Sequence, residues 1–304
     1  MIGGLVLGAN GWRWTQWTTI FFILAFYLPI IFTKETYKKA ILQTKARTLG
    51  SPNSMPELEL GSLLSSTKYF ATTLLVRPVH MILTEPIVTL VCMYNAFLFA
   101  MMYTFVVASP WVFEHYYHFD MVAQALSFLG LMGGTALAPV PLILIDTYIY
   151  QPRLKQFRRE FAGFDRHFPP EHRLYPGVLA SFTLPAFLFG FAWTARPSIH
   201  WIVPIILEGL TILAAVMIYS SANLFMMDSY GPLYGASASG AAMLSRYGLS
   251  AAFPLFALQL YKALGVSWST SLLAFCTLAM APIPWLFWYF GEQLRGKTKY
   301  ETSG

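Results

Sequence analysis

Two residues of opposite charge lie within a long apolar stretch of the sequence. Asp228 and Arg246 both belong to NLFMMDSYGPLYGASASGAAMLSRYGLSAAFPLF, residues 223–256. The Gly-Pro step after Asp228 predicts a helix break, with Asp228 capping the turn. Arg246 would then lie about 18 Å along the next helix, beyond direct reach of Asp228. If that helix crosses a membrane, an unpaired charge costs about 2.5 to 3.5 kcal/mol or more, so we expect Arg246 to face the protein interior and to bind a carbonyl, Asn or Tyr of another helix.

Glu208 is a lone acid in the apolar segment WIVPIILEGLTIL. Carboxyl groups inside membrane spans commonly take part in proton relays. One interpretation is therefore a proton-coupling site. The other is an acid that only helps helices to pack.

Four side chains of the segment CMYNAFLFAMMYTFV could contact a ligand: Tyr94, Asn95, Phe99 and Tyr103. An amide in hydrocarbon needs a hydrogen-bond partner, which another helix or a bound molecule can supply. The aromatic rings suit an amphipathic or cationic molecule, since cations bind to ring faces.

Asp146 ends another apolar segment, in PLILIDTYIYQPRLKQFRRE. An acid at the C-terminus of a helix opposes the helix dipole, so we expect a cationic partner such as Arg153 or Arg158. This contact could lock one conformation. Alternatively, the basic residues that follow only determine topology.

The sequence predicts no catalytic or metal site. The loop EHYYHFD contains Glu114, His115, His118 and Asp120, which are chemically able to bind zinc, but their spacing is a weak signal without a scaffold. No Gly-rich nucleotide loop and no Ser-His-Asp order occurs. We therefore expect neither an enzyme nor a bound cofactor or metal, and no nucleic-acid partner.

Membrane-spanning helices must position these side chains. Hydrophobic residues make up 56% of the chain and charged residues 11%, whereas a soluble domain has about 25% charged residues. A span needs about 20 apolar residues. The sequence thus predicts an all-α polytopic membrane protein with about seven transmembrane helices, over residues 17–33, 86–107, 121–145, 177–195, 201–225, 236–261 and 268–290.

The distribution of Lys and Arg predicts the orientation. If the spans alternate, nearly all of the 20 Lys and Arg residues fall on one side, and the exceptions are Arg13, Arg196, Lys262 and the intramembrane Arg246. Cytoplasmic loops collect basic residues. Segments 34–85, 147–176 and 291–304 are therefore predicted to be cytosolic.

Several stretches together resemble fungal members of the major facilitator superfamily, nearest to the drug:H+ antiporter branch with its polyamine and multidrug exporters. They occur in family order over nearly the whole chain: GWRWTQWTTIFF, KETYKKAILQTKARTLG, RPVHMILTEPIVTLVCMYNAFLFAMMYTFV, PPEHRLYPGVLASFTLPAFLFGFAWTA, DSYGPLYGASASGAAMLSRYGLSAAFPLF and GVSWSTSLLAFCTLAMAPIPWLFWYFG. The resemblance implies a twelve-helix fold of which this chain holds the later part, so that we expect an N-terminally truncated carrier.

The resemblance also implies a domain plan and roles for the residues above. Residues 1–33 would be the end of the fifth helix and the sixth helix, 34–85 a cytosolic central linker, 86–290 a C-terminal six-helix bundle and 291–304 a cytosolic tail. Tyr94 and Asn95 occupy the place of a cavity-lining pair. The motif or gate residues would be Asp146, Arg153, Arg158, Asp228 and Arg246.

The implied function is proton-coupled efflux of small amphipathic or cationic compounds by alternating access. The partners would be a small molecule, the lipid bilayer and a proton, in the plasma membrane rather than the vacuole. Two alternatives stay open: a membrane remnant that does not transport, and a seven-helix receptor. The receptor lacks support, because the last span has neither a lysine for retinal nor an Asn-Pro turn.

The orientation can be tested with epitope tags. A tag inserted between Ser54 and Leu63 and a tag at the C-terminus should both be cytosolic, because both lie in basic segments. In sealed vesicles of known orientation, protease should digest both tags only from the cytosolic face. Digestion of either tag from the opposite face contradicts the assignment.

Overall fold

The computed structural model describes residues 2–33, 76–161 and 168–296, together with positions 41, 44, 45, 48, 72, 298 and 300. The chain divides into two compact units, Ile2–Thr72 and Thr73–Gly304. Throughout the described ranges the regular elements are helices, and no strand occurs there. The predicted all-α class is thus confirmed. Most of the expected linker, 34–85, lies outside the described residues.

The first unit begins with the helices α1 (Ile2–Asn10) and α2 (Trp12–Ile31). Gly11 separates them with a φ of 81°, a left-handed conformation that a side chain disfavours. No residue of α2 is buried within its unit, and the helix is long and apolar enough to cross a membrane. It therefore matches the predicted span 17–33 but begins earlier.

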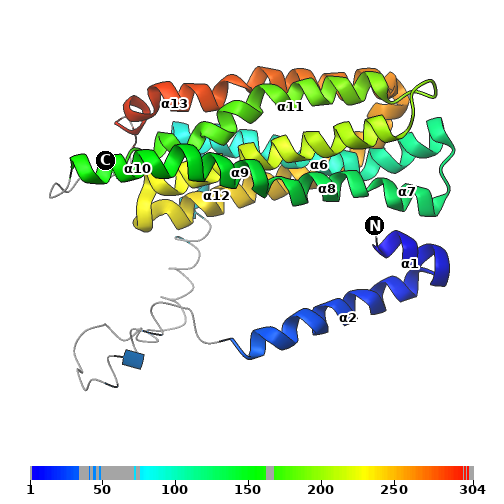
Figure 1. The fold of residues 1–304 in the computed structure, drawn as a ribbon, viewed down its shortest axis with the longest axis horizontal. Helices are drawn as coiled ribbons and strands as arrows, with labels where there is room; N and C mark the ends of the chain where they lie inside the picture. Colours follow the sequence, from blue (N-terminus) through cyan, green and yellow to red (C-terminus); the bar gives the residue numbers. More distant parts are fainter. Residues whose placement is uncertain are drawn as a thin grey trace. The chain divides into compact units, whose positions relative to one another are not determined.

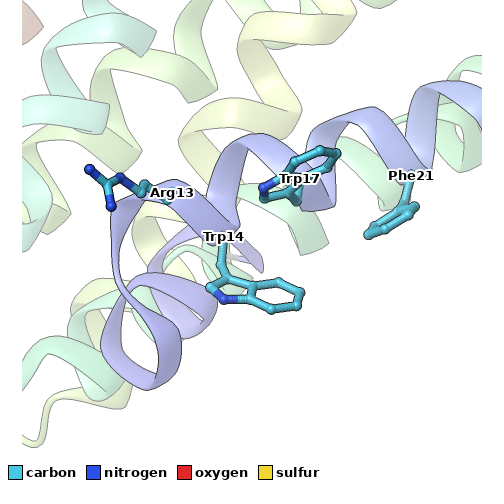
Figure 2. A pocket seen from close by; sticks show the side chains of 4 residues that line it. All are labelled: Arg13, Trp14, Trp17 and Phe21. Atoms are coloured by element: carbon cyan, nitrogen blue, oxygen red, sulfur yellow. The ribbon is translucent and has the colours of Figure 1, made fainter.

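An open hollow of about 540 Å³ lies along the start of α2. Figure 2 shows the four side chains that line it: Arg13, Trp14, Trp17 and Phe21. All four come from one helix, so no second wall encloses a ligand. Trp and basic residues are typical of the membrane–water interface, and this cluster fits that position at the end of a span.

The second unit is a bundle whose long helices run lengthwise beside one another (Figure 1). In chain order its elements are α5 (Arg77–Thr84), α6 (Pro86–Tyr117), α7 (Met121–Ser127), α8 (Leu129–Leu137), α9 (Pro139–Ile145), the π-helical turn η2 (Asp146–Tyr150), α10 (Gln151–Glu160), the 3-10 turn η3 (Pro170–Leu174), α11 (Tyr175–Thr194), α12 (Ile202–Met280) and α13 (Pro282–Arg295).

The helix α12 is broken at two glycines. Gly231 has φ 57° and Gly265 has φ 75°, and both are non-helical. We refer to residues 202–230, 232–264 and 266–280 as the first, second and third arms of α12. The break at Gly231 confirms the one predicted from the Gly-Pro step.

Among the described residues, six helical stretches are long and apolar enough to cross a membrane, whereas seven spans were predicted. The difference lies in the last stretch, Tyr234–Arg295, which has 62 residues. At 1.5 Å per residue it would be about 93 Å long, and a hydrocarbon core is about 30 Å thick. The predicted spans 236–261 and 268–290 lie on either side of the break at Gly265.

The apolar core joins α6 to α11 and α12. Leu98 and Phe105 of α6 are fully buried, and the Phe105 ring meets that of Phe191 on α11 edge to face at 5.1 Å between centroids. Near α13, the rings of Phe225 and Phe287 stack at 5.3 Å. These contacts tie α6 to α11 and the first arm of α12 to α13.

Glycines let α8 approach the first arm of α12 at backbone distance. A Cβ added to Gly134 would overlap the backbone of Gly209, and one added to Gly209 would lie 2.7 Å from the carbonyl oxygen of Gly130. Small residues at helix contacts are a usual means of close packing in membranes. This contact positions the segment that carries Glu208.

The glycine contact predicts unequal effects for two adjacent substitutions. Gly134→Ala should destabilise the bundle by about 1 to 3 kcal/mol, because the added methyl group has no room. Gly133→Ala is the control, since a Cβ there meets nothing within 4 Å. Thermal unfolding in detergent should separate the two variants, and equal midpoints would show that the contact does not constrain the fold.

Candidate functional site

Arg246 lies in an aromatic cage built from three segments. Its guanidinium carbon is 4.5 Å from the ring centre of Phe99 on α6, 5.5 Å from that of Tyr219 on the first arm and 4.6 Å from that of Tyr247. Nη1 donates a hydrogen bond to the Tyr219 hydroxyl at 2.6 Å, and Nη2 donates one to the Tyr247 hydroxyl at 2.9 Å. Cation–π contacts of this kind stabilise a guanidinium away from water.

The reversal of the chain at Gly231 brings this cage together. It returns the second arm alongside the first, so that Tyr219 and Arg246 can meet although 27 positions separate them. Buried small residues on the second arm, including Ala238, Ala241 and Ala242, let the helices approach closely. Arg246 is only 8% exposed, which confirms that it faces the bundle interior. Its partner on another segment is a tyrosine, one of the three expected groups.

Two polar residues of α6 are buried and have side-chain atoms with no hydrogen-bond partner among the described residues. Tyr94 is 1% exposed and Asn95 is fully buried. The Tyr94 hydroxyl and both polar atoms of the Asn95 amide have no partner among the described residues. The interhelical hydrogen bond that the sequence allowed for Asn95 is therefore not formed within the described part of the bundle.

The four α6 residues expected to line one wall are divided. Phe99 packs its ring beneath Arg246 and against Tyr219, with ring centres 5.0 Å apart. Tyr103 is 45% exposed and lies apart from the buried pair Tyr94 and Asn95. The structure thus adds Tyr219 and Tyr247 to this group. Neither residue could be identified beforehand, because both contacts depend on how the arms of α12 pair.

Glu208 is fully buried in the first arm of α12. The Ser109 hydroxyl of α6 donates a hydrogen bond to its Oε2 at 3.2 Å, whereas Oε1 has no partner among the described residues. Nearby, Tyr261 of the second arm and Thr270 of the third share a hydrogen bond of 2.9 Å, and Tyr261 is close enough to interact electrostatically with Glu208. No described cation pairs with this carboxyl group.

Asp146 and Asp228 share one arginine. Arg173 places Nε 2.9 Å from Asp228 and Nη1 3.9 Å from Asp146. Its guanidinium carbon lies 4.2 Å from the ring centre of Tyr150. Asp146 also accepts a hydrogen bond of 3.1 Å from Gln151. Three of these residues, Asp146, Tyr150 and Arg173, border a cavity of about 280 Å³.

The predicted partners of Asp146 are wrong. The expectation assumed that a helix ends at Asp146, but the π-helical turn η2 carries it into α10. Arg153 is then about 10 Å further along the same helix, where it donates to the hydroxyl of Tyr175 and lies over its ring. Asp228 binds the same arginine, Arg173, and its expected role as a cap of its own turn stays a prediction. Any gate role for these residues stays a prediction.

Two buried acids near this end of the bundle were not singled out in the sequence. Glu85, directly before α6, is fully buried and accepts a hydrogen bond of 2.9 Å from the Tyr230 hydroxyl. Glu171 of η3 pairs with Arg295 of α13, and Gly291 leaves the space that its side chain fills. The acids beside proline in TEPIV and PPEHR were the available signals.

Residues 1–254 match the family described as Major Facilitator Superfamily. The MFS-type transporter atr4 of Stereocaulon alpinum is 32% identical over 305 residues, covering 98% of this chain and 52% of that protein. The MFS-type efflux pump MFS2 of Trichophyton rubrum is 33% identical over 296 residues, covering 95% and 48% respectively. The chain therefore spans about half the length of these curated relatives. No solved structure matches.

The two ion-pair sites predict different losses of stability. Arg295→Met should cost about 3 to 5 kcal/mol, because it leaves the Glu171 carboxylate buried without its cation. Arg173→Met should cost less, about 0 to 1 kcal/mol for each pair, since its side chain is 28% exposed and its acids are 41% and 44% exposed. Unfolding titrations in mixed micelles measure both losses. A larger loss for Arg173→Met would contradict this ranking.

Proposed function

The chain belongs to the major facilitator superfamily, and we propose that it takes part in proton-coupled efflux of a small amphipathic molecule. It is an integral, multi-pass membrane protein. Because the chain spans about half the length of its curated relatives, transport itself is part of this proposal, as are the drug:H+ antiporter branch and the plasma membrane.

One observation carries the proposal: polar groups with unused hydrogen-bonding capacity are buried within an apolar bundle. They belong to Tyr94, Asn95 and Arg246. Leaving such groups unpaired costs about 1 to 3 kcal/mol each. A protein that needed only stability would gain from apolar residues at these positions. A transported molecule that binds between the helices can satisfy them.

Glu208 supports the proton-coupled part of the proposal. A buried carboxyl group with a single hydroxyl partner and no described cation can take up and release a proton as its surroundings change between conformations. Ser109 orients one oxygen, and the other oxygen is left for proton exchange. The same carboxyl group could act only in helix packing, so its replacement is the decisive test.

Glu208→Gln should abolish proton-driven transport but preserve exchange. The amide keeps the size of the side chain and can still accept from Ser109, yet it cannot carry the proton. We would use membrane vesicles from a pump-deficient yeast that expresses the chain together with the N-terminal half of a relative such as MFS2. The probes are 1-naphthoate and 1-naphthylmethylammonium, which have the same ring system and opposite charges.

Wild-type vesicles should accumulate at least one probe when a proton gradient is imposed. Glu208→Gln should reduce this uptake at least tenfold, which corresponds to about 1.4 kcal/mol. Gradient-free exchange should stay within about twofold of the wild type. Glu114→Gln, an exposed acid of α6, is the control. Uptake of neither probe by the wild type would overturn the transport proposal, and full activity of Glu208→Gln would overturn the role of Glu208.

A further inference from the structure

The charge of Arg246 is not neutralised within the described part of the bundle. None of the ion pairs there involves it. The hydroxyls of Tyr219 and Tyr247 accept its hydrogen bonds, but neutral phenols supply no negative charge. The aromatic rings therefore hold the Arg246 guanidinium without neutralising it, and its positive charge stays in the protein interior.

The guanidinium also has unused donors. It carries five N–H groups, and the two hydrogen bonds to the tyrosines account for only part of them. Its Nε is buried and has no partner among the described residues. An arginine held flat in this way suits a carboxylate or another planar anion, which can accept two parallel hydrogen bonds.

The spacing along α6 places the buried Asn95 amide on the same side of the helix as the Phe99 ring of the cage. Asn95 and Phe99 are four positions apart and so share one face of the helix. Phe99 touches the Arg246 guanidinium, and both polar atoms of the Asn95 amide lack partners among the described residues. A molecule that covered the Phe99 ring and reached Arg246 would come within range of this amide.

Tyr247 provides the way in. Its side chain covers the guanidinium, yet the residue is 58% exposed, and its neighbours Met243 and Leu244 are each 51% exposed. The Tyr247 side chain therefore lies between the Arg246 guanidinium and one face of the bundle. Rotation of that side chain would uncover Arg246 without breaking a helix.

From these contacts we infer that the site recognises a flat aromatic organic anion, such as a carboxylate, and disfavours organic cations. The anion replaces the Tyr247 hydroxyl on Arg246, and its ring packs against Phe99 and Tyr219. This inference rests on the proposed transport function and narrows its substrate class. The sequence left two substrate classes open, amphipathic and cationic molecules. The positive charge of Arg246 repels cations and so excludes the second class.

The test compares binding of the two naphthyl probes to the purified 304-residue chain in nanodiscs. Isothermal titration should show 1-naphthoate binding at least tenfold more tightly than 1-naphthylmethylammonium. Arg246→Gln should weaken naphthoate binding at least tenfold and remove the preference. Arg159→Gln, an exposed arginine of α10, should change neither affinity.

A second variant covers the case in which Arg246→Gln does not fold. Arg246→Lys keeps the charge but loses the planar fork, so naphthoate should bind more weakly and still be preferred. Unchanged naphthoate affinity in Arg246→Lys, or a preference that survives Arg246→Gln, would show that the anion binds elsewhere.

The vesicle assay separates the two proposals. Equal or tighter binding of the amine to the wild type would overturn the anion inference, and transport of the amine would then leave the carrier function intact. If neither probe is transported, the carrier function fails whatever the nanodiscs show.

Discussion

The structure depends on one constraint: the thickness of the membrane limits how long a continuous helix that crosses it can be. As one continuous helix, the 79 residues of α12 would be about 119 Å long, whereas the hydrocarbon core is about 30 Å thick. The chain from Ile202 onward resolves this conflict at Gly231 and Gly265, where positive φ angles interrupt the helix. Each break returns the chain to the bundle. Side chains that are distant in sequence, such as those of Tyr219 and Arg246, meet only for this reason.

Polar groups inside an apolar bundle need protein partners. How completely they are partnered differs along the molecule. Close to the Gly231 break, the acids are matched: Glu85 by Tyr230, Glu171 by Arg295 and Asp228 by Arg173. Farther along α6 and the second arm, Asn95 and Arg246 keep unused capacity. The matched acids therefore lie at one level of the bundle and the proposed recognition site at another.

Local sequence patterns were sufficient to predict the features that depend on a single helix. Hydropathy located the spans, and the Gly-Pro step located the first break in α12. The helix class and the burial of Arg246 followed from composition and from the cost of an exposed charge. The second break was predicted only as the gap between the spans 236–261 and 268–290, because a glycine alone between apolar segments does not mark the exact residue at which the helix is interrupted.

Pairing between segments could not be predicted. Whether Asp146 meets Arg153 or Arg173 depends on whether a helix ends or continues, and a π-helical turn decided this against the simpler expectation. Tyr219 and Tyr247 are ordinary aromatic residues of apolar segments until the arms of α12 are paired. That no acid lies beside Arg246 in the described bundle is likewise a result of packing. The inferred preference for an organic anion rests on this observation.

The glycine contact between α8 and α12 has a mechanical consequence. With no side chains between Gly134 and Gly209, the two backbones interlock, and sliding one along the other would require them to separate first. The helix α8 and the first arm of α12 should therefore move as one rigid unit. Any bending within α12 is then left to the breaks at Gly231 and Gly265, which lie at opposite ends of the arm that carries Arg246.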